Sequence, residues 1–330
     1  MKSAPVDLFG FFRTCVAIAD HAPSSGYDQH QDAALWRAGT KQARSRFMTD
    51  RRNDPFFHAA AFVLLAATAS WFSPLSMAQA ASSDWAQSEG GDVRIIAAPP
   101  TADGTIPAIL EIRLKPGWKT YWLEPGASGI PPQVTIDPTS GISFSGLRFP
   151  APKTFDDGVV RYVGYDRSVA LPMQLRQTVA GSVVDLKASV FLGICMDICI
   201  PVQAELSLAL PSGTVANPLE QARIDDATAA LPEPPTADLK VTATTIDPAT
   251  HSLRIAFVVP DDDRAAPEIF LAGPSGFSFG KPSINAAADG GFVADIPYRA
   301  PAKGGELKGR TALFVLRSGR RSMETSLAFE

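Results

Sequence analysis

Apolar and polar residues alternate with period two along several stretches of the chain beyond residue 90. The clearest examples are residues 109–114, 173–176 and 205–210. This alternation is typical of strands that have one buried and one solvated face. Turn-forming groups such as Lys115-Pro116-Gly117 and Asp156-Asp157-Gly158 lie between these stretches, at the spacing found in antiparallel sandwiches. The pattern therefore predicts an all-β protein whose first domain, residues 81–212, is a β-sandwich.

A different pattern separates this domain from the rest of the chain. Asn217, Pro218 and Glu220 are suited to the start of a helix, and the helix is expected to continue over 222–231 until the prolines of 232–235 end it. Residues 213–235 are thus expected to form a helix and a linker. Strand-like patterns resume in the remaining segment and predict a second, smaller β domain over 236–330. Its expected strands are residues 239–246, 252–259, 291–296, 311–316 and 323–329.

The N-terminal region has the order of a secretory signal. Arg51 and Arg52 precede an uncharged apolar run over residues 59–72, and Ala78-Gln79-Ala80 follows. A basic segment, a short apolar segment and an A-x-A site are the features that export machinery and signal peptidase recognise. The run is too short for a membrane anchor, which needs about 20 apolar residues. We therefore expect a signal peptide over 48–80, cleavage near Ala80, export to the periplasm, and an upstream, disordered extension over residues 1–47.

Composition and charge narrow the classes of function. Hydrophobic residues make up 45% and charged residues 19% of the chain, with a mean hydropathy of +0.04, which fits neither a disordered chain nor a multi-span membrane protein. The formal net charge is −4, so the chain lacks the basic character of proteins that bind nucleic acid. No Ser-His-Asp arrangement or phosphate-binding loop with supporting context is evident, and no organic cofactor is expected.

Cys195 and Cys199 carry the most specific chemical signal. The chain has three cysteines, but Cys15 falls in the expected extension. The other two lie four residues apart between apolar strand-like segments, so they are expected at the end of a hairpin. Export favours disulfides, and a close-set pair can meet if the chain turns. One intramolecular disulfide is therefore expected.

Three functions remain open for this pair. A bridge that closes so short a loop stabilises a fold by only about 2 kcal/mol in the chain-entropy account, which favours a redox role over a structural one. A disulfide that only pins a hairpin in a binding or assembly module is the alternative. Cysteine and methionine sulfur at Cys195, Met196 and Cys199 would also suit Cu(I), although zinc-type spacing is missing from the sequence. Asp197 disfavours a thiolate on either cysteine.

Several segments together resemble a known family. Gly-Trp-Lys-Thr-Tyr-Trp at 117–122, Phe-Pro-x-Pro-Lys at 149–153 and Cys-x-x-x-Cys-x-Pro at 195–201 resemble, in this order, the N-terminal periplasmic domain of DsbD-type thiol-disulfide reductases. The resemblance covers about residues 85–212. It implies an immunoglobulin-like fold in which the cysteines pass electrons through mixed disulfides, with Cys199 as the attacking and Cys195 as the resolving cysteine.

The resemblance also implies neighbours for the two cysteines. Members of the family cover the pair with a cap loop, and Phe155, Asp156 and Asp157 are the nearest match to it. Tyr121 and Trp122 fall where the family places aromatic residues beside the cysteines. Each has a plain alternative, because Asp-Asp-Gly is a favourable turn and strand aromatics often only pack in a core.

The implied partners are proteins. Full-length DsbD continues into a membrane segment and a thioredoxin-like domain, and the 330 residues contain neither. The electron donor is therefore expected to be a separate thioredoxin-like protein or membrane thiol transporter. The acceptor is expected to be a periplasmic disulfide isomerase or another oxidised envelope protein. These expectations describe a stand-alone periplasmic component of a protein-disulfide reductase system, with a docking or spacer role for residues 236–330.

Overall fold

The structure is a computed structural model that describes residues 82–330 except for 127–128, 157, 159–160, 180, 211–216, 261–265, 289 and 303. The described residues belong to one compact unit, Pro74–Glu330. The predicted extension and signal peptide, residues 1–80, lie outside the described residues. Among the described residues, none of the helices has the length and apolar character needed to cross a bilayer.

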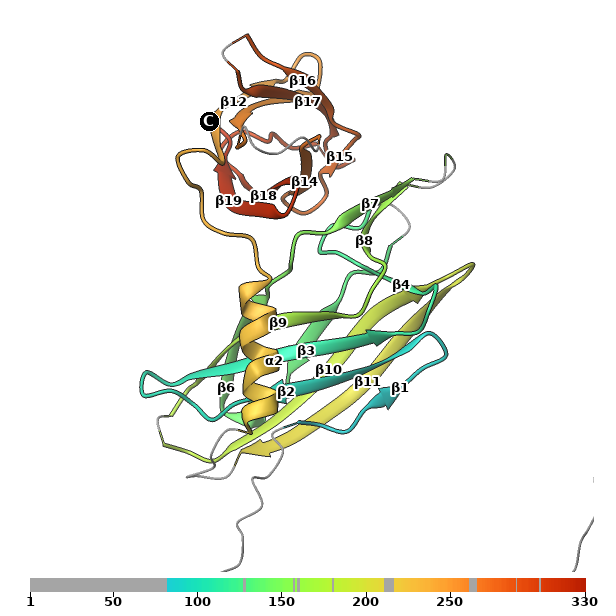
Figure 1. Ribbon diagram of the computed structural model, residues 1–330, viewed down its shortest axis with the longest axis vertical. Coiled ribbons are helices and arrows are strands. Elements are labelled where there is room, and N and C mark those ends of the chain that lie inside the picture. The colour runs from blue at the N-terminus through green and yellow to red at the C-terminus, as the bar shows by residue number, and fades with distance from the viewer. Residues whose placement is uncertain are drawn as a thin grey trace, which may run out of the picture. The chain divides into compact units, whose positions relative to one another are not determined.

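Two antiparallel sheets form the first β domain (Figure 1). The first sheet has the order β1-β2-β3-β9-β6. Its strands are β1 (Ala86–Gln87), β2 (Gly91–Ala97), β3 (Thr105–Leu114), β9 (Val169–Gln177) and β6 (Ile142–Leu147). The second sheet has the order β11-β10-β4-β8-β7, and β5 also pairs with β10. Its strands are β11 (Cys199–Leu210), β10 (Val184–Cys195), β4 (Lys119–Tyr121), β8 (Arg161–Tyr165), β7 (Lys153–Asp156) and β5 (Gln133–Ile136).

Alternation along the longest strands builds the core between these sheets. Every second residue of β11 from Val202 to Leu210 is buried, and the residues between them are exposed. Leu110 and Ile112 of β3 and Leu171 of β9 belong to the same hydrophobic cluster. Burial of such side chains typically contributes about 1.5–3 kcal/mol each. The all-β, immunoglobulin-like class predicted from the sequence is confirmed.

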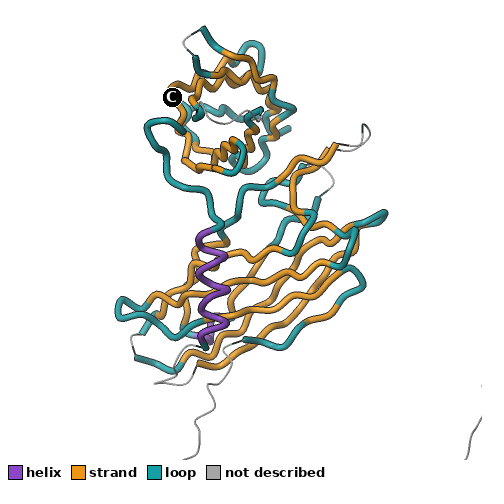
Figure 2. Tube along the Cα trace, in the orientation of Figure 1, coloured by secondary structure: helices purple, strands orange, loops and turns teal. Residues whose placement is uncertain are grey.

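One α-helix lies against the outer face of the first sheet (Figure 2). Helix α2 spans Pro218–Ala229, and the side chain of Asn217 accepts a hydrogen bond from the backbone N–H of Leu219. This N-cap satisfies a backbone donor that the first helical turn leaves free. Ile224 and Ala227 pack against Ile96 and Ile109 of the sheet. The outward apolar residues of β2 and β3 are therefore covered by the helix.

A second β domain follows the helix. One sheet has the order β12-β13-β17-β15, with β16 also paired to β17, and a three-stranded sheet has the order β14-β18-β19. The strands of the first of these sheets are β12 (Lys240–Asp247), β13 (Ser252–Val258), β15 (Ser278–Phe279), β16 (Ser283–Ala286) and β17 (Phe292–Arg299). Those of the three-stranded sheet are β14 (Glu268–Ala272), β18 (Thr311–Ser318) and β19 (Arg321–Ala328). Phe257, Phe314 and Phe329 are among the buried residues of their shared core.

Apolar and polar contacts connect residues of the two β domains. Phe270 and Val315 of the second domain belong to the hydrophobic cluster of the first, and Phe270 meets the Trp122 ring edge-on at a centroid distance of 6.1 Å. Arg317 donates a 2.9 Å hydrogen bond to the backbone oxygen of Pro152, and Arg148 forms an ion pair with Glu324. Because the contact between Trp122 and Phe270 is buried, the two β domains share an apolar contact in addition to their polar surface contacts.

Candidate redox site

The end of the β10–β11 hairpin brings the two cysteines together. Cys195 and Cys199 are the last cross-strand pair of the ladder, their Cα atoms are 4.1 Å apart, and they form a disulfide. Their spacing permits the bond because three residues form the turn between paired strand ends. Cys195 is 7% exposed and therefore buried, whereas Cys199 is exposed. An incoming thiolate therefore has better access to the sulfur of Cys199.

Tyr121 contacts both sulfurs. Its phenolic oxygen lies 2.8 Å from Sγ of Cys195 and 2.9 Å from Sγ of Cys199. A disulfide has no proton to give, so the tyrosine O–H is the donor. Burial, and to a smaller extent the nearby Tyr162, raises the pKa of Tyr121 above its usual value of 10.0. The hydroxyl consequently remains a proton-bearing donor across the neutral range.

A glycine allows Tyr121 to approach strand β10. A Cβ atom at Gly193 would lie 3.0 Å from Cε2 of Tyr121 and 2.9 Å from Cβ of Ile130, which is closer than ordinary packing allows. The backbone oxygen of Gly193 also accepts a 2.9 Å hydrogen bond from the hydroxyl of Thr120. The absent side chain and this bond together position β4 against β10, with the Tyr121 hydroxyl at the sulfurs.

Two further rings extend the site away from the disulfide. The Tyr162 ring meets Tyr121 edge-on, with centroids 5.7 Å apart. The Phe155 ring stacks on that of Tyr162, with centroids 5.0 Å apart. Phe155 and Tyr162 are direct cross-strand partners of β7 and β8, so strand pairing fixes the stack. We call Tyr121, Tyr162 and Phe155 the aromatic relay.

Lys119 places a positive charge beside the aromatic relay. It is the cross-strand partner of Cys195, and directly opposed residues have Cβ atoms about 4.5–5.5 Å apart on one face of a sheet. Its ammonium nitrogen lies 5.1 Å from the Phe155 centroid and 5.7 Å from that of Tyr162. These are cation–π contacts. Lys119, opposite Cys195 in the ladder, and Asp197, in the hairpin turn, thus carry charges of opposite sign.

Exposed apolar side chains surround Cys199. Met196 is 50% exposed and Ile198 is 69% exposed, and both lie in the hairpin turn. Exposed apolar residues beside a reactive group are suited to contact with a protein partner. The turn thus combines an accessible sulfur with a small apolar surface.

The structure assembles only part of the predicted set of site residues. It brings Cys195, Cys199 and Tyr121 into direct contact, and it connects Phe155 to them through Tyr162. Trp122 instead lies in the core, 1% exposed, with its ring against Phe270. Adjacent strand residues point to opposite faces, so Tyr121 and Trp122 cannot both face the cysteines.

Of the two acidic residues expected in the cap loop, the structure describes only Asp156. Asp156 is exposed, accepts a hydrogen bond from the Gly158 backbone and lies 3.6 Å from the ammonium nitrogen of Lys281. Asp157 lies outside the described residues. Asp156 therefore has the turn and ion-pair contacts of a surface residue.

Sequence reasoning did not single out Lys119, Tyr162 or Gly193 as members of the site. A signal for Lys119 is present, since it precedes Tyr121 by two residues and so shares its face of the strand. Tyr162 and Gly193 carry no such local signal. Tyr162 reaches the site because β8 pairs with β7, and Gly193 reaches it because β10 pairs with β4. Both pairings join residues that are distant in sequence.

Protein-family models match both β domains. A family model described as "Thiol:disulfide interchange protein DsbD, N-terminal" matches residues 92–211. Residues 92–211 form a DsbD N-terminal domain. Its match includes both cysteines and the whole aromatic relay. A second model, a domain of unknown function (DUF8393), matches residues 230–330.

Solved structures agree with the fold. The N-terminal periplasmic domain of ScsB from Proteus mirabilis aligns with a TM-score of 0.63 and 24% identity, covering 76% of this chain and 100% of that one. The aligned part of this chain is longer than residues 92–211. The solved domain therefore also aligns with residues outside the first β domain. A marsupial T cell receptor aligns with a TM-score of only 0.18 at 9% identity. A search of curated proteins found no match.

Proposed function

We propose that this protein is a periplasmic thiol-disulfide exchange component. It accepts electrons from a separate thioredoxin-like protein or membrane thiol transporter and passes them to oxidised envelope proteins. The DsbD N-terminal domain supports the class of reaction. The similarity to a periplasmic domain supports the compartment, and the predicted signal peptide agrees with it.

The exchange begins at Cys199. A donor thiolate attacks Sγ of Cys199, a bond forms between these sulfurs, and the Cys195–Cys199 bond breaks with its electron pair leaving on Sγ of Cys195. The Tyr121 hydroxyl donates a hydrogen bond to that developing thiolate. The second thiol of the donor then attacks its own mixed-disulfide sulfur, which releases Cys199 as a thiolate and the donor as a disulfide. Two electrons have moved to this protein.

The reverse sequence reduces an acceptor. The Cys199 thiolate attacks one sulfur of the acceptor disulfide and forms a mixed disulfide, and the other acceptor sulfur leaves as a thiolate. Cys195 then loses its proton and attacks Cys199, which restores the intramolecular bridge and releases the second acceptor thiolate. Both acceptor sulfurs finally take protons from solvent. Neither sequence requires a cofactor.

One observation carries the proposal: the two cysteines differ in their exposure to solvent, and the same tyrosine hydroxyl contacts both of their sulfurs. Cys199 is exposed and Cys195 is 7% exposed, which separates an attacked sulfur from a protected leaving sulfur. Tyr121 contacts both. A bridge that only pinned the hairpin would require neither the hydroxyl nor the exposure difference.

Trapping the mixed disulfide tests the proposal. We expect Cys195→Ser, expressed in the native host, to accumulate thiol-labile adducts on Cys199, because the resolving sulfur is missing. Cys199→Ser is the matched control and should form far fewer adducts through buried Cys195. Mass spectrometry of non-reduced samples measures both. Equal adduct levels in the two variants, or none in either, would contradict the proposal.

A further inference from the structure

A cavity of about 550 Å³ lies on the other side of the strands that carry the redox site. Its wall includes Trp122 and Arg161, which directly adjoin Tyr121 and Tyr162 in sequence. Because neighbouring strand residues point to opposite faces, β4 and β8 direct Tyr121 and Tyr162 towards one face and this cavity lies on the other. The volume is within the roughly 300–1,000 Å³ of small-molecule sites.

Two residues of this wall each carry a buried donor that has no hydrogen-bond partner among the described residues. Trp122 is 1% exposed, and its indole Nε1 is buried without an acceptor. Nε of Arg161 is likewise buried without one. The Arg161 guanidinium also forms no ion pair with any described residue. Buried polar groups are nearly always hydrogen-bonded, so two orphan donors on one cavity wall indicate that an acceptor is missing.

The remaining charges of the cavity favour an anion. Arg299 also lines it, and Glu124 is the one carboxylic side chain among the described lining residues. Burial raises the pKa of Glu124 above its usual value of 4.5. Two guanidinium groups therefore outweigh a single carboxyl group.

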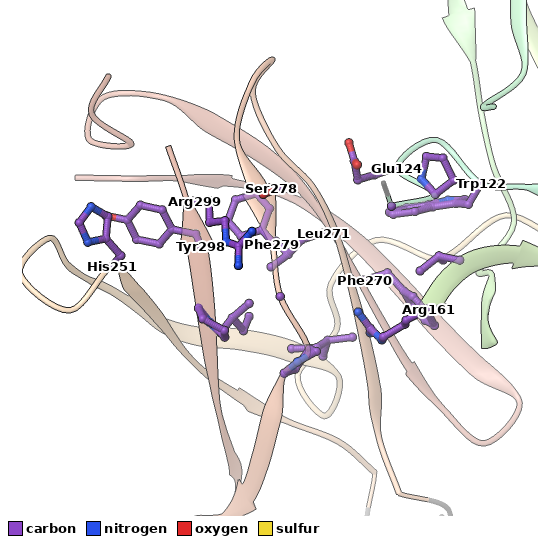
Figure 3. Close-up of a pocket in the computed structure, with 18 of the residues that line it drawn as sticks. Trp122, Glu124, Arg161, His251, Phe270, Leu271, Ser278, Phe279, Tyr298 and Arg299 are labelled. Atoms are coloured by element: carbon purple, nitrogen blue, oxygen red, sulfur yellow. The ribbon is translucent and has the colours of Figure 1, made fainter. Parts of the chain in front are cut away.

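Apolar side chains form much of the rest of the cavity. Figure 3 shows Trp122 and Glu124 together, Arg161 beside Phe270, and Leu271 and Phe279 between this end and the end at His251 and Tyr298. The Tyr298 ring contacts the His251 ring at 5.6 Å. A ligand with a charged group near Arg161 would thus have an apolar and aromatic surface for its remaining part.

We propose that this cavity binds a small organic acid, with its carboxylate at the Arg161 and Trp122 donors and its apolar body along Phe270, Leu271 and Phe279. A carboxylate supplies the missing acceptors and pairs with the guanidinium in its preferred fork geometry. The site is distinct from the disulfide, and it does not depend on thiol-disulfide exchange.

Calorimetry with matched acids and amides tests the inference. Hexanoate and 4-phenylbutanoate should each bind the full chain at least about tenfold more tightly than hexanamide and 4-phenylbutanamide, since only the acids pair with the guanidinium. Arg161→Gln should remove this preference. Arg167→Gln is the matched control, because Arg167 is an exposed arginine of the loop after β8 that does not line the cavity.

Three results would overturn the inference. They are equal binding of acid and amide, no binding of either acid, and equal weakening by Arg161→Gln and Arg167→Gln. A titration of the wild-type chain by NMR avoids dependence on a variant that folds poorly. The indole N–H resonance of Trp122 should shift as 4-phenylbutanoate is added, and shifts confined to residues outside the cavity would also overturn it.

Discussion

The hydroxyl of Tyr121 is equidistant, within 0.1 Å, from the two sulfurs of the Cys195–Cys199 bridge, at 2.8 and 2.9 Å. A single O–H can donate fully to one sulfur at a time. As the bridge opens, charge develops on the leaving sulfur of Cys195, and the hydrogen bond is strengthened there because bonds to charged acceptors are stronger than bonds to neutral ones. The position of Tyr121 thus favours opening of the bridge in the proposed exchange.

Replacing Tyr121 by phenylalanine should slow disulfide opening. A hydrogen bond to a charged group contributes about 1.5–3 kcal/mol, which corresponds to a rate reduction of roughly tenfold to a hundredfold. Stopped-flow reduction by dithiothreitol measures the rate. Tyr165→Phe is the control, because Tyr165 is also a buried tyrosine of this sheet but donates to the Pro150 backbone oxygen. A Tyr121→Phe rate equal to that of the control would refute the role of the hydroxyl.

Replacing Lys119 by methionine should make the attacking thiol less acidic. A nearby positive charge lowers a thiol pKa, so its loss should raise the pKa of Cys199 in the reduced protein, by up to about one unit for a partly solvated charge. The pH dependence of alkylation by iodoacetamide reports this value. Lys153→Met serves as the comparison, since the Lys153 ammonium is bound to Asp166 at 3.0 Å. An unchanged alkylation profile in Lys119→Met would argue against the electrostatic effect.

Truncating Phe155 to alanine should expose the disulfide to small thiols. The ring stacks on Tyr162, and aromatic pairs contribute about 0.5–1.5 kcal/mol, so we expect reduction by glutathione to accelerate roughly twofold to tenfold. Phe144→Ala in β6 of the other sheet provides the matched truncation. If both variants react at the wild-type rate, Phe155 does not shield the bridge.

Alkaline pH should destabilise the fold through Tyr165. Burial raises its pKa well above 10.0, so the folded state holds the phenolic proton more tightly than the unfolded state does. The resulting stabilisation is complete below pH 10 and is lost as the pH rises from 10 towards the folded-state pKa, at up to about 1.4 kcal/mol per pH unit. Urea unfolding at pH 8 to 11 measures the decline. Tyr165→Phe should be less stable than wild type at pH 8 yet lose stability less steeply above pH 10, and parallel curves would contradict this assignment.

Local periodicity was sufficient to predict much of the fold. The alternation at 109–114, 173–176 and 205–210 falls within β3, β9 and β11, and the Asn217 cap precedes the observed helix. Strand β14 was not predicted, because Ile269, Phe270 and Leu271 form a continuous apolar run. Such a run has no period-two signature when both faces are covered, as they are here by the two cores.

The amino-acid sequence alone was enough to single out Cys195 and Cys199 and to place them at a hairpin end, because two cysteines four residues apart between two strands have little freedom. The tertiary structure decided which sulfur is exposed, which aromatic residue contacts both, and where Trp122 lies. It also created the cavity at Arg161. These features depend on pairing between residues that are 43 to 76 positions apart in sequence, such as those that join β4 with β8 and β10. Which face of each strand meets its partner is set by the register of that pairing, and local spacing does not encode it.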